Sequence, residues 1–555
     1  MPVYTGDSLR NIFYPLGGMG TGNILVGGRG NILEWEIFNR AQRDELPPYM
    51  TFFSIWCREE GSEPVSRVLE RRHFDDFANG FGVPRQQLAG LPRFEEAAWS
   101  GAPPLVSIKL EDNTVPLEIS LECFNPLIPL AVDASSYPAG EFNWIVRNPG
   151  KNRVDFSLAF FLSNPFRNLN YRGNEPGYPV RCSSLSDASR NTGDSPGLEA
   201  GATGNRPGSW NGLFLENLVD PASPDFGNMA VASDHPGMVL NTGLVAERWW
   251  DDAHLIWGRF SEDGGLAPRE EPVNHTGRGE VVSSLLARGT LEPGGTDTVR
   301  FLVAWYVPNR ELEESQAFGS GEIAGHVTRN YYSLGFKDAR EVMHRYLDER
   351  RELHRLSDRF RERMAASTVP GPVLDAAASN LAILKSNLVS RMENGDLHGY
   401  EGLGPDFGCC PGNCTHVWNY AQSLASLFPS LERNVRETAY LTQTFESGYQ
   451  CFRTTFPIGD SHFRNVAADG QMGNIMRAYR EWKFSGDSTW LARLWPAVKR
   501  SLEYAWSGTI PGSRENEWQS EGNAWDPGRR GVLSGKQHNT YDVDFYGPNM
   551  LTGSL

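Results

Sequence analysis

The sequence lacks several features that would point to common classes of protein. No run of basic residues is present, and 52 Lys and Arg against 68 Asp and Glu give a net charge of −16. Nucleic acids and anionic membranes attract positive charge, so neither is a predicted partner. No window approaches the roughly 18 apolar residues of a membrane span, and the N-terminus lacks a basic segment followed by an apolar run. We therefore expect no transmembrane helix, no signal peptide and a cytoplasmic location.

Cysteine is also scarce, with seven residues in the chain. An odd number without a secretion signal argues against a disulfide framework. Three of them cluster in "GCCPGNC", residues 408–414, but a zinc ribbon needs a second separated pair and none exists. We predict a structural turn with a packed thiol there, and no metal or cofactor.

Motifs for nucleotide binding and for serine hydrolysis are missing as well. The stretch "GGMGTGNILV", residues 17–26, resembles a phosphate loop but lacks a GK[ST] ending and a following helix. Its last four residues are typical of a strand, so we predict tight turns whose glycines need positive φ. No G-x-S-x-G elbow is present, and nothing beside the clustered cysteines would activate a nucleophilic thiol.

What the chain does have is a change of pattern along its 555 residues, a length that predicts about two to four domains. Residues 1–335 contain short alternating runs separated by Gly, Pro, Asn and Asp, with a turn expected at Asp112-Asn113 and a long Gly/Pro/Ser-rich loop at 191–212. This pattern predicts an N-terminal β-sandwich domain. Residues 336–370 are charged helix formers and predict an exposed connecting helix.

Residues 371–555 have helical periodicity. One helix is expected from "VLDAAASNLAILKSNLVSRM", and further helices are expected at 415–428, 430–445, 470–484 and 488–506. Asp487 is the expected N-cap of the helix at 488–506. Successive helices with short connections suggest hairpins arranged in a ring, the (α/α)6 barrel. The predicted fold class is thus multidomain β + α, a β-sandwich followed by an incomplete (α/α)6 barrel.

The helix count falls short of such a ring. About five helices are predicted between Pro372 and Trp506, and one more begins at Asn549, close to Leu555. We expect the chain to be a fragment of a longer protein. Its exposed apolar helix faces would then favour association or aggregation.

Sugar hydrolysis commonly uses two carboxyl groups, so loop acids among aromatics and amides are candidates. The first is Glu401 in "HGYEGLGPDFGCCPGNCTHVWNYAQ", where His416 and Trp418 open the following helix as a hydroxyl partner and a sugar platform. A solvated loop acid and ordinary helix-end packing are the alternatives.

The second candidate is "HNTYDVDFYGPN", in which Asp542 would share a face with Thr540 if the segment is extended. A turn, with Asn549 capping the next helix, is the alternative. A weaker third loop, "SHFRNVAADGQMGN", contributes His462 and Asp469.

Five ordered segments resemble glycoside hydrolase family 116, the family of the non-lysosomal glucosylceramidase (bile-acid β-glucosidase) and of bacterial and archaeal β-glucosidases. They are "YPLGGMGTGNI" with "LEWEIFNR", then "YEG", "CTHVWNYAQSLASLFPSLER", "YREWKFSGDSTWLARLWPAVKRSLEYAW" and "HNTYDVDFYGPN". The resemblance implies the same β-sandwich and (α/α)6 barrel, and retaining hydrolysis of β-glucosides, sometimes β-xylosides. The implied substrate is a small carbohydrate or a glycolipid.

The resemblance also implies roles for individual residues. Glu401 matches the nucleophile of the "EG" motif, and Asp542 matches the acid/base of the "TYD" motif. Thr540 and His416 match motif positions near the sugar. In the loop after Glu401 this chain has "CCPGNCTH", whereas vertebrate-type members have a tyrosine-rich segment, so the resemblance assigns no contacts there.

The expected mechanism is double displacement, with Glu401 attacking the anomeric carbon while Asp542 protonates the leaving oxygen. An inverting hydrolase or a phosphorylase on the same barrel is one alternative. A non-catalytic carbohydrate-binding fragment is the other.

Overall fold

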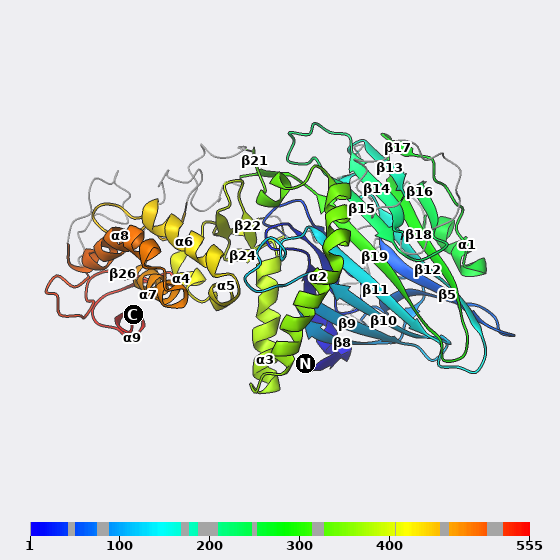
Figure 1. The fold of residues 1–555 in the computed structure, drawn as a ribbon, viewed down its shortest axis with the longest axis horizontal. Coiled ribbons are helices and arrows are strands. Elements are labelled where there is room, and N and C mark those ends of the chain that lie inside the picture. The colour runs from blue at the N-terminus through cyan, green and yellow to red at the C-terminus, as the bar shows by residue number, and fades with distance from the viewer. Residues whose placement is uncertain are drawn as a thin grey trace, which may run out of the picture.

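The computed structural model describes residues 2–42, 50–74, 88–167, 177–186, 209–246, 252–312, 327–405, 407–454, 466–507 and 525–555. Strands gather on one side of the molecule and the C-terminal helices on the other, with a long helix between them (Figure 1). A β-rich N-terminal region is therefore followed by a helical one, as predicted. His462 and most of the predicted loop at 191–212 lie outside the described residues.

Two large, mostly antiparallel sheets form the N-terminal region. In spatial order, the ten-stranded sheet contains β1 (Val3–Thr5), β8 (Glu96–Ala102), β9 (Leu105–Glu111), β10 (Glu118–Phe124), β11 (Ala139–Arg147), β19 (Thr296–Tyr306), β15 (Asn228–Ser233), β14 (Asn211–Asn217), β13 (Val180–Leu185) and β17 (Val273–His275). The six-stranded sheet contains β16 (Val239–Ala246), β18 (Glu280–Leu291), β12 (Val154–Ser163), β5 (Phe52–Glu59), β6 (Val65–Arg71) and β7 (Arg93–Phe94).

The hairpin of β9 and β10 confirms the predicted turn at Asp112-Asn113. Leu110 lies opposite Ile119 across the pair, and the Asp112 carboxylate accepts a hydrogen bond from Thr114 N at 2.8 Å. This side-chain contact stabilises the turn locally, because Asp can bond to its own backbone two residues on.

The two large sheets pack face to face through aromatic rings. Phe53 of β5 stacks on Phe160 of β12 at 4.1 Å between ring centroids, and contacts Phe142 of β11 and Phe301 of β19 at 5.3 and 5.4 Å. All four rings belong to one buried cluster. Burial of such large apolar surfaces stabilises the arrangement expected of a β-sandwich.

A three-stranded sheet carries the glycine-rich stretch. It consists of β2 (Phe13–Leu16), β3 (Asn23–Gly27) and β4 (Ile32–Glu36). Gly20 and Gly22 have φ of 67° and 77°, and a Cβ on Gly20 would lie 2.9 Å from Arg391 N. The predicted strand and positive-φ turns are both confirmed, because only glycine fits so close a backbone contact.

Shorter elements complete the β-rich region. They are η1 (Gly6–Asn11), η3 (Pro165–Arg167), α1 (Ala253–Asp263), β20 (Asn309–Glu311), β21 (Val327–Arg329) and η4 (Tyr331–Leu334).

The long helix α2 (Ala339–Ala365) begins at Asp338, whose side chain accepts a hydrogen bond from Glu341 N. The prediction that this helix is exposed is wrong. One face packs on the ten-stranded sheet through Val342, Met343 and Tyr346, which are fully buried. The many charged residues on the other face made the sequence look exposed all round. A long helix can pack on a sheet through a narrow apolar face, and that face is not obvious in such a sequence.

The helical region contains α3 (Gly371–Ser379), η5 (Asn380–Lys385), α4 (Thr415–Trp418), α5 (Gln422–Leu427), α6 (Pro429–Leu441), α7 (Ala468–Ser485), α8 (Ser488–Ser507) and α9 (Met550–Gly553). Its short strands are β22 (Val389–Arg391), β23 (Leu397–Gly399), β24 (Gly402–Leu403), β25 (Gly408–Cys409), β26 (Gln537–His538) and β27 (Asp544–Phe545).

The sequence located these helices better than it located their ends. Asp487 caps α8 by accepting from Trp490 N at 2.9 Å, and Asn549 caps α9 by accepting from Thr552 N at 3.0 Å, as predicted. The single helix predicted after Pro372 is wrong in its second half. After α3 the chain forms the 3₁₀ helix η5 and then the strand β22. The helix expected over 415–428 is interrupted at residues 419–421.

Within the described residues these helices do not make up six hairpins, so the barrel stays a prediction. Large apolar side chains are exposed along α7, α8 and α9, among them Met476, Tyr479, Phe484, Trp495 and Met550. None of the helices in the described ranges combines the length and the hydropathy that crossing a bilayer requires.

Candidate active site

Glu401 lies between β23 and β24, where a short hairpin fixes its backbone. Its N–H donates to Cys409 O at 3.0 Å, which joins the residue to β25. The side chain is 23% exposed, and Oε1 lies 2.6 Å from Nη2 of Arg453. Glu401 is thus a carboxylate beside a buried guanidinium, and the alternative of a simply solvated loop acid does not describe it.

Arg453 is a site residue that the sequence analysis missed. It donates from Nη1 to Cys410 O at 3.1 Å, and its guanidinium lies 4.9 Å from the ring centre of Phe452. These contacts hold the positive charge in place beside Glu401. No motif marks this arginine, because the fold brings it from a segment 52 residues farther along the chain.

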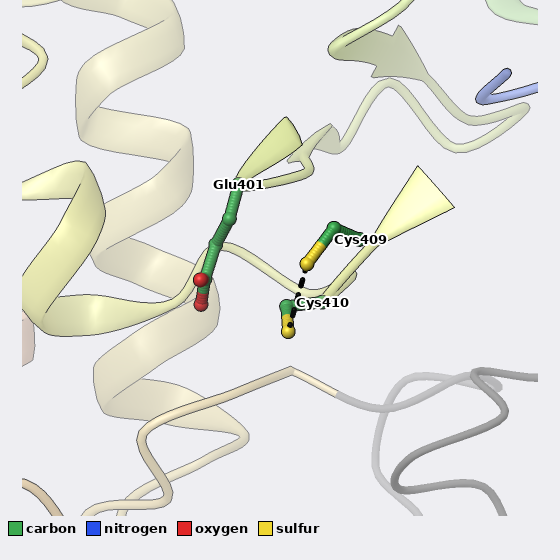
Figure 2. Close-up of side chains that lie close together, drawn as sticks. All are labelled: Glu401, Cys409 and Cys410. Atoms are coloured by element: carbon green, nitrogen blue, oxygen red, sulfur yellow. Dashed lines mark hydrogen bonds between the residues drawn. The ribbon is translucent and has the colours of Figure 1, made fainter. Parts of the chain in front are cut away.

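Three cysteines surround the Glu401 carboxylate. The Cys414 thiol is hydrogen-bonded to it. Burial and this hydrogen bond raise the pKa of Cys414 well above its ordinary range, although the charge of Arg453 acts in the opposite direction. Cys409 and Cys410 also lie close to it, with 3.3 Å between their sulfur atoms (Figure 2). All seven cysteines of the chain are free thiols.

His416 and Asp469 form a buried pair behind this carboxylate. His416, at the start of α4, has Nδ1 3.5 Å from Asp469 Oδ1. Asp469 lies in the first turn of α7 and also accepts from Gly470 N at 2.8 Å, a position where the helix dipole favours negative charge. Ligand atoms of Glu401, Cys414 and His416 all lie within 4.8 Å of one another.

Asp469 connects this pair to the loop of Asp542. Its second oxygen, Oδ2, accepts from the backbone N–H of Thr540 at 3.0 Å. Three of the predicted site residues, His416, Asp469 and Thr540, are therefore joined by direct contacts although they come from distant parts of the chain.

The loop between β26 and β27 is a turn organised by Asn539. This buried amide donates to Val543 O at 2.8 Å and accepts from Tyr541 N at 3.0 Å. Asp542 follows with φ of 55°, so the segment is not extended at this residue, and the alternative stated from the sequence, a turn with Asn549 capping the next helix, describes it. Aspartate tolerates this left-handed conformation better than most residues, which suits it to the tip of the turn.

The Asp542 side chain is 84% exposed, and Oδ1 lies 3.9 Å from Nε2 of His538. The His538 ring in turn lies 6.0 Å from the His416 ring and 5.7 Å from the Phe452 ring. Burial and the neighbouring His416 lower the pKa of His538, against the opposing effect of the carboxylates of Asp544 and Asp542. A continuous array therefore runs from Arg453 and Glu401, past the two histidines, to Asp542.

Trp418 does not reach this array as a platform. It is buried in an apolar cluster with Met19 and Leu397, and a Cβ on Gly399 would lie 1.9 Å from its ring. Ordinary helix-end packing, the alternative weighed from the sequence, describes Trp418 in this structure.

A cavity of about 1010 Å³ lies beside the array, between α4, α7, α8 and α9. His416 and Asp469 are on its wall, together with the apolar side chains of Tyr479, Trp495 and Leu502. Glu401, Asp542, Thr540 and Trp418 are not among its lining residues.

The chain has a β-rich region followed by a helical one, and the site in the helical region contains two acids, histidines and an arginine. Such groups suit a glycoside hydrolase, the class to which this chain belongs. A family model described as beta-glucosidase 2, glycosyl-hydrolase family 116 N-term, matches residues 14–353. The chain is accordingly a member of glycosyl-hydrolase family 116.

Two of the solved structures that match this chain are distant from it. A putative kojibiose phosphorylase from the human microbiome is 10% identical with a TM-score of 0.33, over 93% of this chain and 53% of that one. The chain thus spans about half the length of that protein. A putative aldose 1-epimerase from Escherichia coli K12 is 11% identical with a TM-score of 0.26, over 53% of this chain and 99% of that one.

Proposed function

We propose that this chain carries the catalytic carboxylates of a retaining β-glycosidase that hydrolyses β-glucosides. Glucosylceramide and β-xylosides are the candidate substrates beyond simple glucosides. The proposal includes an (α/α)6 barrel as the catalytic domain, of which the helical region is a part, and a cytoplasmic location.

In the first step the Glu401 carboxylate attacks the anomeric carbon while Asp542 gives its proton to the departing oxygen. The bond from the anomeric carbon to the leaving group breaks as the ester to Glu401 forms. In the second step Asp542 takes a proton from water, whose oxygen attacks the same carbon and releases Glu401. Configuration is retained because the carbon is inverted twice.

The observation that carries the proposal is the surroundings of Glu401, in a chain of family 116. Arg453, 2.6 Å away, balances the negative charge that a nucleophile must keep and that returns when the ester is hydrolysed. The Asp469 contacts to His416 and Thr540 N hold the turn of Asp542 against the same region. Asp542 itself is exposed and accessible to a leaving group.

The nucleophile assignment is tested by Glu401→Ala on an aryl β-glucoside, with and without azide. We expect the variant to lose hydrolysis, and azide to restore turnover as a glycosyl azide of inverted configuration. Unchanged hydrolysis by Glu401→Ala would refute the role. Proton NMR of the first-formed sugar separates a retaining enzyme from an inverting one, which would release the opposite anomer.

The acid/base assignment is tested by Asp542→Ala on aryl glucosides of graded leaving-group ability. The first step should be spared for very good leaving groups and slowed for poor ones, because only poor ones need a proton. Asp358→Ala, a surface acid on α2, is the matched control. An equal loss on all substrates would contradict the acid role.

A further inference from the structure

Cys409 and Cys410 are two thiols for which the hydrolytic mechanism has no use, and they lie beside the Glu401 carboxylate. One sulfur from each cysteine and one carboxylate oxygen lie within 4.8 Å of one another, at an intermediate depth below the surface. We propose that these three side chains bind one thiophilic divalent cation of the Zn²⁺ class. The sequence offered no second cysteine pair for such an ion, but the fold supplies Glu401 as the third ligand.

The backbone holds these donors in place without an ion. Glu401 and Cys409 belong to neighbouring strands joined by the 3.0 Å bond from Glu401 N to Cys409 O. Cys410 has φ of 53°, and its sulfur lies next to that of Cys409 (Figure 2). Asn413 secures the end of the loop by accepting from Gly399 N at 2.6 Å. A site whose ligands are already oriented loses little entropy when it binds an ion.

The ligand chemistry suits zinc better than calcium or magnesium. Zinc accepts thiolate sulfur at about 2.3 Å and carboxylate oxygen at about 2.0–2.2 Å, so donors a few ångströms apart can share one ion. Each thiol that binds releases its proton to solvent, and a water molecule takes the fourth position. Calcium and magnesium prefer oxygen ligands throughout.

A second set of donors, Glu401, Cys414 and His416, is less suited. Cys414 and His416 are buried, the Cys414 thiol is hydrogen-bonded to Glu401, and His416 contacts Asp469. Cys409 and Cys410 are partly exposed, which leaves a path from solvent. The ion must compete with Arg453 for the shared carboxylate.

One consequence rests on the proposed function. An ion bound to Glu401 occupies the carboxylate that would attack the anomeric carbon, so ion binding and glycosyl-enzyme formation exclude each other. Zinc is therefore expected to inhibit hydrolysis competitively with respect to substrate.

The test is titration of the full chain with Co²⁺, followed by displacement with Zn²⁺, in which thiolate-to-cobalt absorbance reports the ligands. We expect one ion per chain, and affinity about 100-fold or more weaker in Cys409→Ser and in Cys410→Ser. Cys451→Ser, outside the cluster, is the matched control and should bind as the unaltered chain does. Circular dichroism checks that each variant is folded.

Absence of a thiolate band, an affinity in both serine variants equal to that of the unaltered chain, or loss of binding in Cys414→Ser alone would overturn the site. Binding is measured without substrate, so it is independent of the catalytic proposal. If the ion binds while Glu401→Ala hydrolyses normally, the catalytic role fails and the metal site stands. If no ion binds while Glu401→Ala is inactive, the reverse holds.

Discussion

The Arg453 side chain places a positive charge next to Glu401. Its Nη2 lies 2.6 Å from the carboxylate, and its own position is fixed by Cys410 O and the Phe452 ring. An oriented positive charge in a partly buried site acts more strongly than one in water, because the surrounding dielectric is lower. We therefore treat Arg453 as a positioning residue for the proposed nucleophile, Glu401.

Replacing this charge should impair catalysis more than binding. Arg453→Met is expected to lower kcat by about 100-fold with a smaller change in KM, and Arg453→Lys should recover part of the loss. Steady-state kinetics on an aryl β-glucoside measure both constants. Arg493→Met, an exposed arginine paired with Glu437, is the control and should behave as the unaltered chain does. Equal losses in the Met and Lys variants, or a change in KM alone, would contradict the positioning role.

Sequence reasoning at the residue scale worked where the signal is local. Asp487 and Asn549 cap their helices as expected, since a cap depends only on neighbouring residues. It could not find Arg453, which reaches Glu401 only through the fold. It left the backbone of Asp542 open between an extended segment and a turn, because alternating polar and apolar residues are compatible with both.

At the scale of elements, the loop between β26 and β27 is held by a contact from helix α7 and by hydrogen bonds within the loop. Asp469 at the start of α7 accepts from Thr540 N, and Asn539 closes the turn by bonds to both of its sides. Helix α7 is thereby coupled to the position of Asp542. These polar contacts hold the loop in its shape.

The docking of α2 on the ten-stranded sheet depends on a buried charge cluster around Glu141 of β11. Arg350 donates to both carboxylate oxygens at 2.9 and 2.7 Å, Tyr346 donates at 2.9 Å, and His354 Nε2 lies 2.8 Å away. Burial alone raises the pKa of Glu141, but the hydrogen bond of His354 and the charge of Arg350 outweigh it and lower the pKa to about 2.

This cluster predicts a pH dependence of stability. The folded pKa lies below the ordinary glutamate value, so the stabilisation is complete at neutral pH and is lost as pH falls from about 4.5 towards 2, in all about 3 kcal/mol. Glu141→Gln should melt at a lower temperature than the unaltered chain at pH 7, and the difference should narrow below pH 4.5. Calorimetry at several pH values measures this.

Glu352→Gln, an exposed acid on the same helix, is the control and should change the melting temperature far less at each pH, because its pair with Arg355 is exposed to solvent. A difference between Glu141→Gln and the unaltered chain that stays constant down to pH 3 would contradict the assigned pKa. The sequence predicted α2 as a helix but not its docking, because the charged residues that contact Glu141 look like a solvated face.

At the scale of the whole molecule, apolar side chains remain exposed on the helical region. Tyr479, Trp495 and Leu502 line one cavity, and each is more than two-fifths exposed. Contiguous apolar surface of this kind favours association. The change from strands to helices was predictable from periodicity along the sequence. The arrangement of the helices in space was not predictable in this way, because the order of the hairpins depends on contacts that no local pattern records.

The exposed surface predicts association that depends on concentration. Trp495→Glu combined with Tyr479→Lys should reduce the apparent mass in light scattering at high protein concentration, because charged side chains disfavour apolar contact. Leu130→Glu, at an exposed position on the β-rich region, is the control and should associate as the unaltered chain does. A monomer at all concentrations before any substitution would contradict this prediction.

The central claim is that Glu401 forms a covalent bond to the sugar. Reaction with an activated 2-deoxy-2-fluoro-β-glucoside, followed by peptide mass spectrometry, tests it most directly, because the fluorine slows the second step and lets the intermediate accumulate. The account predicts one fluoroglucosyl group per chain on the peptide that contains Glu401, and none in Glu401→Gln. A label on another residue, or turnover of glucosides with inversion and no label, would contradict it.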